Sequence, residues 1–262
     1  MFNPTVASIT LRATLGRKRA LLFAIPPVIL IAFTLLLRTA HGAARAWPSH
    51  VLGTFGFTVL LPLLALIIGT SVLGAEIDEG SIIHLLATPV SRASVVLTKY
   101  TVATALTIVF AAIPEGIAAL LSGGGSTPAS QVIQNGSVQF IPGVPIGAGK
   151  LALALFIGAV VGAIIYNAIF VMVSVATTRA IAVGLLYVLI WESLLSNFVN
   201  GARLLSVSHY ALGVANGIVK DSGLNAGLTV ATSVVMGAIV TVLALILAVR
   251  LLSSFTVKGD PA

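Results

Sequence analysis

The sequence of 262 residues contains no cysteine and few charged side chains, and both shortages narrow what the protein can be. Without cysteine it has no disulfide bond, no thiolate metal site and no cysteine nucleophile. Charged residues make up 8% of the chain, whereas a soluble domain carries about 25%, and hydrophobic residues make up 58%. This composition excludes a large water-soluble catalytic domain and indicates a membrane protein with several spans.

Long apolar runs predict an all-α fold with six transmembrane helices, in a single transmembrane domain that covers residues 1–262. A spanning helix needs about 20 apolar residues, and these runs are apolar throughout instead of alternating as membrane strands do. The third span is expected to be interrupted at Pro114, and the fifth contains an acid, Glu192. The spans are expected at residues 20–37, 51–74, 94–121, 151–177, 180–199 and 228–252.

Lysine and arginine are distributed unequally between the two sides of this predicted domain. With six spans, the side that holds both termini contains Arg12, Arg17, Lys18, Arg19, Arg92, Lys99, Arg179, Arg250 and Lys258, and the other side contains Arg38, Arg45, Lys150, Arg203 and Lys220. Basic residues favour the cytoplasmic side, so both termini are expected to be cytoplasmic and the protein to lie in the cytoplasmic membrane. The net charge of +7 is therefore explained by the orientation of the spans and by contact with anionic membrane lipid, and no nucleic acid partner is expected.

Three segments outside the spans have patterns of their own. Residues 1–19 predict an amphipathic interfacial helix, with Asn3-Pro4 as its start signal; a ragged polar leader is the alternative. Residues 122–149 are rich in Gly, Ser, Pro, Asn and Gln and predict a polar outer loop. Residues 200–227 form a second outer segment, whose apolar stretch can dip part-way into the membrane if protein surrounds it.

The cytoplasmic loop at residues 75–93 has the pattern of a short amphipathic helix. Acidic residues stand at its start, where the helix dipole favours negative charge, and Ile82, Leu85 and Leu86 fall on one face. Pro89 ends the pattern before the next span. A helix placed between two spans indicates a docking surface, and a helix that merely lies at the membrane interface is the alternative.

This loop resembles the segment between the second and third spans of type-2 ATP-binding-cassette (ABC) transporter permeases. The resemblance implies that residues 76–88 form a coupling helix, which sits in a groove of a cytoplasmic ABC ATPase. It also implies an ABC exporter that contains two ATPase subunits and a second permease subunit, in a homodimer or a heterodimer. The residues that fit the pattern are Glu76, Glu79, Gly80, Leu85, Leu86, Pro89, Val90, Ser91, Arg92 and Lys99, with Ser81 where threonine is usual.

The chain has no phosphate-binding loop of its own, and we expect it not to be an enzyme. The nearest match runs from Gly143 to Lys150; it is one residue too long, and Leu151 replaces the hydroxyl residue that binds magnesium. We expect no catalytic residue, no metal site and no cofactor on this chain, with ATP and magnesium bound by the partner ATPase.

Three polar residues inside predicted spans are candidates for a translocation path: Glu115, Asn167 and Glu192. A carboxylate in the hydrocarbon costs at least about 2.5 kcal/mol, so such residues usually face the protein interior. Either acid can line a substrate path or bind a proton, or it can hydrogen-bond a helix end. For Asn167 the alternative is a hydrogen bond between helices. A gradient-driven secondary carrier that uses Glu115 or Glu192 is the alternative to the ABC exporter.

Small residues recur in the fourth predicted span. Ala154, Gly158 and Gly162 follow a small-xxx-small spacing, which lets two helices approach closely. The spacing fits a seam between two subunits, and it fits packing within one subunit equally well.

Overall fold

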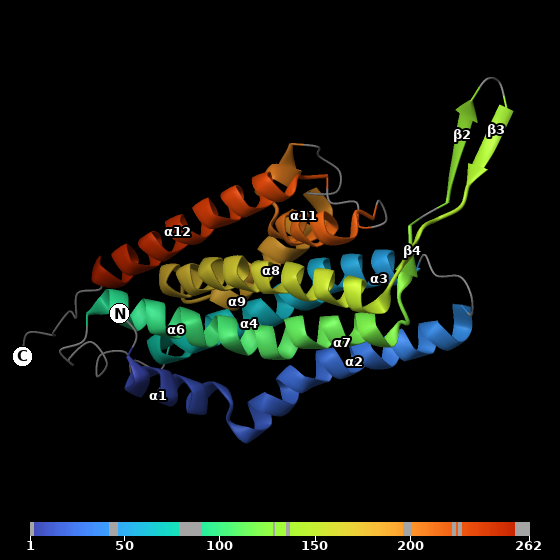
Figure 1. Ribbon diagram of the computed structural model, residues 1–262. Coiled ribbons are helices and arrows are strands. Elements are labelled where there is room, and N and C mark those ends of the chain that lie inside the picture. The colour runs from blue at the N-terminus through green and yellow to red at the C-terminus, as the bar shows by residue number, and fades with distance from the viewer. Residues whose placement is uncertain are drawn as a thin grey trace, which may run out of the picture.

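Figure 1 shows the computed structural model, a bundle of long helices from which one β-hairpin projects. The structure describes residues 3–41, 47–78, 91–127, 129–134, 137–195, 201–221, 224 and 227–254.

Five helices in the described ranges are long and apolar enough to cross a membrane: Leu21–Ala40, Trp47–Gly74, Arg92–Leu121, Ala148–Ala176 and Val230–Ser254. They confirm five of the predicted spans. The sixth, expected at residues 180–199, contains the shorter apolar helix Ala180–Glu192, and residues 196–200 lie outside the description. The sixth span therefore stays a prediction.

Two of the five spans are composite, because each contains a π-helical turn. The second span consists of α3 (Trp47–Phe55), the π-helical η1 (Gly56–Leu60) and α4 (Leu61–Asp78), and the third of α6 (Arg92–Thr107), the π-helical η2 (Ile108–Ala112) and α7 (Ile113–Leu121). The other elements are α1 (Pro4–Thr14), α2 (Arg17–His41), α8 (Ala148–Ala176), α9 (Ala180–Leu186), the π-helical η3 (Tyr187–Leu195), the 3-10 helix η4 (Ala202–Leu205), α11 (Val207–Val219) and α12 (Val230–Ser254).

The predicted interruption of the third span at Pro114 is wrong, since the helix runs on to Leu121. A proline lacks the N–H donor and its ring clashes with the carbonyl four residues earlier, which normally breaks a helix. Here η2 lies directly before α7, in which Pro114 is the second residue. The wider π-helical turn makes room for the proline ring, so the chain passes it without a break.

The N-terminal helix begins where the sequence predicts. The Asn3 side chain accepts hydrogen bonds from the N–H groups of Thr5 and Val6, and Pro4 is the first helical residue. The Asn3 N–H also donates to Thr98 Oγ1 of α6 at 3.0 Å, which ties α1 to the bundle. The placement of α1 at a membrane surface stays a prediction.

The centre of the bundle is α8, which packs against α4, α7, α11 and α12. Its small residues allow this contact. A Cβ at Gly158 would lie 2.8 Å from the Ala211 carbonyl oxygen of α11, and one at Gly162 would lie 3.3 Å from the Ala211 Cβ. The small-xxx-small spacing thus serves packing within one subunit, and the alternative of a seam between subunits is not needed to explain it.

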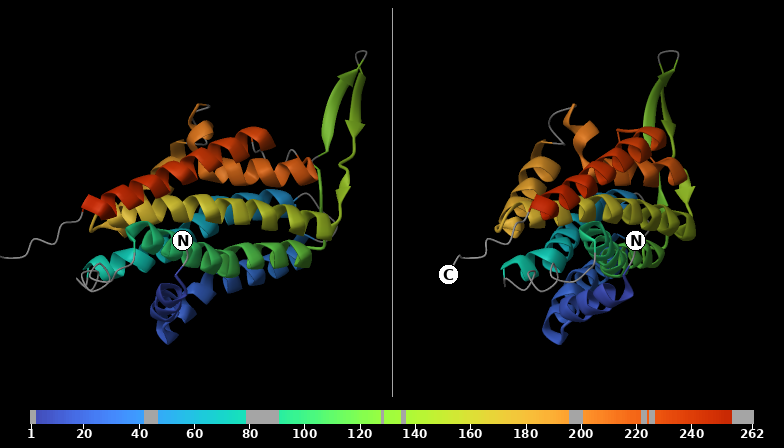
Figure 2. Two further views of the ribbon diagram at one scale, coloured as in Figure 1. Left: turned by 60° about the vertical axis from the view of Figure 1, so that its left-hand side comes forward. Right: turned by 90° about the vertical axis from the view of Figure 1, so that its left-hand side faces the viewer.

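Residues 122–149 correct the all-α prediction, because they contain two small antiparallel sheets. β1 (Gly125–Ser126) pairs with β4 (Pro145–Ile146), and β2 (Ser130–Gln134) pairs with β3 (Ser137–Ile141). The β2–β3 hairpin projects away from the helices in Figures 1 and 2. The strand signal was the alternation of polar and apolar residues in Ser137–Ile141, which the polar composition of the whole loop obscured.

Candidate functional site

The candidate path residues are all buried. Glu115 lies in the first turn of α7 with 1% of its surface exposed, while Glu192 in η3 and Asn167 in α8 are 0% exposed. Both acids lie in or just after a π-helical segment, a feature that is frequent at functional sites. No hydrogen bond joins any two of the three residues in the described part of the chain. They form three separate environments.

The Glu192 carboxylate binds the start of α11. Its Oε1 accepts hydrogen bonds from the Val207 N–H at 2.8 Å and from the Tyr187 hydroxyl at 2.9 Å. Its Oε2 accepts from the hydroxyls of Ser206 at 2.6 Å and Ser208 at 2.7 Å, and from the Ser208 N–H at 3.3 Å. The two amides are the first of α11 and have no acceptor inside the helix, so the carboxylate completes the helix end.

Ser206 extends this cluster to a histidine. Its Oγ lies 3.0 Å from His209 Nδ1, and Ser206 is also the N-cap residue of α11. Burial lowers the pKa of His209; the charge of Arg203 acts in the same direction, and that of Glu192 opposes it. Although Ser, His and Glu meet here, the carboxylate binds the serine and not the histidine, so the arrangement is not that of a catalytic triad.

Glu192 therefore stabilises a helix end, one of the two roles weighed from the sequence. The end belongs to α11 and not to the helix that carries Glu192. The missed signal was the pair Ser206 and Ser208 at the start of an apolar stretch, where helix N-caps are expected. At 13 residues α11 extends about 20 Å, which is too short to span a bilayer, and it is buried against α8 and α12.

Glu115 has the opposite environment. Neither of its carboxyl oxygens has a hydrogen-bond partner among the described atoms. The carboxyl group lies directly against the backbone of Gly56, the first residue of η1, and a methyl group at Gly56 would overlap it. Within the described residues, the expectation that Glu115 hydrogen-bonds a helix end is wrong.

Asn167 links two helices of the core. Its Nδ2 donates to Thr107 Oγ1 of α6 at 2.9 Å and to the Ala163 carbonyl at 2.8 Å. This confirms the hydrogen bond between helices that was the alternative to a path residue. Its Oδ1 has no partner among the described atoms and lies beside Gly69 of α4. A role in a translocation path stays a prediction for Asn167.

Most of the predicted coupling helix lies outside the described residues. This applies to Glu79, Gly80, Leu85, Leu86 and Pro89. The backbone of Glu76 belongs to the last turns of α4, which runs to Asp78. The predicted segment therefore starts as a continuation of a membrane-spanning helix.

Arg92, the last residue of the predicted coupling set, binds the end of α12. Its Nη1 donates to the carbonyl of Leu252 at 3.0 Å and to that of Ser253. The last carbonyls of a helix have no donor inside the helix, and a basic side chain satisfies them. The sequence did not predict this contact, because 160 positions separate Arg92 from Leu252. The start of α6 and the end of α12 thus lie at one end of the bundle (Figure 1).

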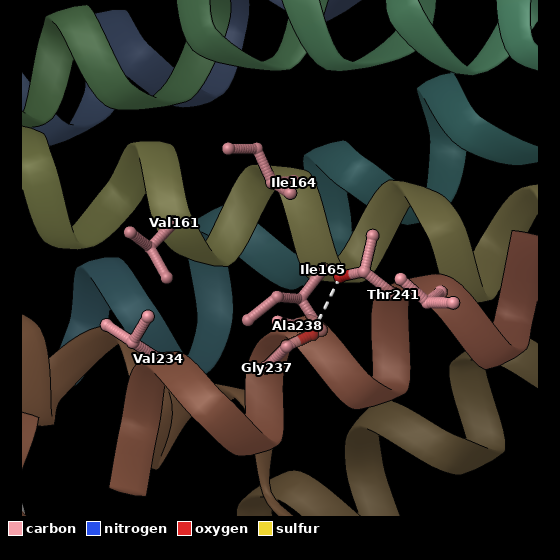
Figure 3. A pocket seen from close by; sticks show the side chains of 8 residues that line it. Val161, Ile164, Ile165, Val234, Gly237, Ala238 and Thr241 are labelled. Atoms are coloured by element: carbon pink, nitrogen blue, oxygen red, sulfur yellow. Dashed lines mark hydrogen bonds between the residues drawn. The ribbon is translucent and has the colours of Figure 1, made fainter. Parts of the chain in front are cut away.

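A groove with a volume of about 310 Å³ lies between α8 and α12 (Figure 3). Thr241 carries the one hydroxyl among its lining side chains and donates it to the Gly237 carbonyl at 2.8 Å. The groove thus offers no free side-chain donor for a polar substrate. Its lining residues are Val161, Ile164, Ile165, Val234, Gly237, Ala238, Thr241 and Val242.

A comparison with models of protein families gives a match. A family model described as "ABC-2 family transporter protein" matches residues 15–189, which is more than half of the 262-residue chain. The match includes Glu115, Asn167 and the segment between α4 and α6. No curated protein matches the chain.

Proposed function

The chain belongs to the ABC-2 transporter family, and on that premise we propose that it exports a substrate across the cytoplasmic membrane, driven by ATP hydrolysis on a separate subunit. Family membership and five helices of spanning length make it a multi-pass membrane subunit of an ABC transporter. The sequence lacks a phosphate-binding loop, which supports an ATPase partner that binds ATP and magnesium.

The observation that carries the proposal is the way in which α4 and α6, the helices on either side of residues 79–90, are tied into the bundle. These two helices pack against each other, and the fully buried Lys99 of α6 donates from Nζ to the Val72 carbonyl of α4 at 2.5 Å. Arg92 ties the start of α6 to α12. A displacement of the connecting segment therefore acts on three tethered membrane helices at once, as coupling to an ATPase requires.

We assign the contact with the ATPase to residues 76–88. Leu85 and Leu86 supply its apolar part, and Glu76 and Glu79 face basic groups of the ATPase or cap the helix. Gly80 belongs to the family pattern within the segment, and Pro89 ends it. Two ATPase subunits and a second permease subunit complete the transporter, because six spans are half of the twelve implied by the family resemblance.

The gradient-driven carrier is less well supported. An ion-carrying acid has to release its partners in each cycle, whereas Glu192 accepts five hydrogen bonds from the described residues, and four of them come from Ser206, Val207 and Ser208 at the start of α11. This argument speaks against Glu192 as the ion-carrying acid, and the proposal takes ATP as the energy source from the family match.

The test is co-purification of ATP hydrolysis with the tagged chain after mild detergent extraction from its native cells. Burying one leucine side chain is worth about 1.5–3 kcal/mol, so the double change Leu85→Ala/Leu86→Ala should weaken ATPase binding by about 100-fold or more. Glu79→Gln removes one charge; an exposed ion pair is worth about 0–1 kcal/mol, so this change should weaken binding by less than about tenfold.

The matched control is Val138→Ala/Phe140→Ala. These side chains are 63% and 67% exposed on β3, so the variant removes exposed apolar groups away from the proposed contact. It should keep the ATPase bound. Equal retention of the ATPase by the double leucine variant and this control would remove residues 76–88 from the interface.

A further inference from the structure

Glu115 is a buried acid that has no hydrogen-bond partner among the described residues. It is 1% exposed, and neither oxygen has a hydrogen-bond partner among the described atoms. Two neighbouring π-helical segments flank it: η2 ends three residues before it, and η1 begins at Gly56, against which the carboxyl group lies. The carboxyl group thus contacts one π-helical segment, and the residue that carries it follows the other by three positions.

No counter-charge approaches Glu115 from the elements that pack around α7, which are α2, α3, η1, η2 and α8. The titratable groups described there are Arg38 of α2, His50 of α3, and Lys150 and Tyr166 of α8. Arg38 donates to the Leu121 carbonyl at 2.7 Å, while His50 and Lys150 are exposed. None of these groups forms a hydrogen bond or an ion pair with the Glu115 carboxyl group.

An ionised carboxylate in this position would be strongly unfavourable, because a buried charge without a counter-charge loses its hydration and gains nothing in return. The neutral acid has a far smaller desolvation cost. A metal or organic cation would need volume and further oxygen ligands, but the contact with Gly56 leaves no room even for a methyl group. A proton needs neither additional volume nor further oxygen ligands.

We propose that Glu115 is a proton-binding site, which holds a proton in this conformation and releases it when α7 separates from η1. The π-helical η2 supplies a route to that separation. A π-helical turn holds one extra residue, so its return to α geometry rotates the following helix by one residue, or about 100°. Such a rotation would turn Glu115 away from Gly56 and let its proton pass to water.

The first half of the proposal is tested by infrared spectroscopy of the purified full-length chain at neutral pH. We expect the wild type to show the carbonyl band of a protonated carboxylic acid. The band should disappear in Glu115→Gln and remain in Glu192→Asp. The same acid band in wild type and Glu115→Gln would overturn the proposal.

The second half is tested with Gly56→Ala, whose added methyl group forces the carboxyl group away from η1. The deuterium-induced shift of the acid band should appear at least tenfold faster in this variant than in wild type. Gly53→Ala is the matched control, because its methyl group meets the end of the flexible Leu224 side chain. Equal rates in wild type and both variants would show that the η1–α7 contact does not retain the proton.

If Gly56→Ala does not fold, the rate is measured in Gly116→Ala, which places a methyl group 3.3 Å from Phe156 Cβ at the α7–α8 contact. An unchanged rate there would also contradict release by movement of α7. Neither half of the proposal rests on the ATPase, and no step of these experiments requires one. A failure here therefore leaves the proposed export function untouched, and the reverse also holds.

Discussion

Replacing Glu192 by glutamine measures how much its carboxylate contributes to stability. Glutamine keeps one acceptor oxygen and places an NH2 group where the other oxygen was. The hydroxyls of Ser206 and Ser208 can rotate to accept from that group, but a backbone N–H cannot. Since each carboxylate oxygen accepts one backbone N–H, from Val207 or from Ser208, the variant leaves one of these amides without an acceptor.

The expected loss follows from these contacts. A buried donor left without a partner costs about 1–3 kcal/mol. Removal of the negative charge from the start of α11 adds up to about 2 kcal/mol in a buried setting. Glu192→Gln should therefore lower the free energy of unfolding by about 2–4 kcal/mol, and Glu192→Ala, which loses all five hydrogen bonds, should lower it further.

The assay is denaturant unfolding in detergent, combined with hydrogen exchange of the α11 amides. A loss of about 2–4 kcal/mol corresponds to about 30- to 1,000-fold faster exchange if α11 opens locally. Glu115→Gln is the control, because Glu115 accepts no hydrogen bond from the described residues. This variant should lower the free energy of unfolding by less than about 1 kcal/mol. If both variants unfold alike and α11 exchanges at the wild-type rate, the Glu192 cluster does not hold α11.

Two further predictions concern helix contacts. Gly158→Ala places a methyl group 2.8 Å from the Ala211 carbonyl and should destabilise the protein by about 1–3 kcal/mol in the same unfolding assay, whereas Gly149→Ala, which meets nothing within 4 Å, should be neutral or slightly stabilising. Arg92→Ala removes the donors to the last carbonyls of α12 and should speed amide exchange in its final turn by about three- to tenfold, a cost of about 0.5–1.5 kcal/mol. The exposed Arg250, replaced by alanine, is the control, and an equal effect of both arginine changes would contradict the tether.

The sequence by itself determined the class of protein, five of the spans and the start of α1. These features depend on neighbouring residues only. An apolar run of sufficient length has to satisfy its backbone internally and so forms a helix, and Asn3-Pro4 caps a helix through bonds to the next few amides. The family resemblance was read from the loop at residues 75–93, and the family model matches residues 15–189.

Only the tertiary structure separated the two acids, which the sequence treated alike. Glu192 meets donors from residues 14 to 16 positions further on, while Glu115 meets a glycine backbone from another span. The sequence also could not predict the hydrogen bond from Arg92 to the end of α12, because the two partners lie 160 positions apart in the chain. Hydrogen-bond partners of this kind depend on which helix faces come together in the bundle, and that is decided by the packing of all the helices at once.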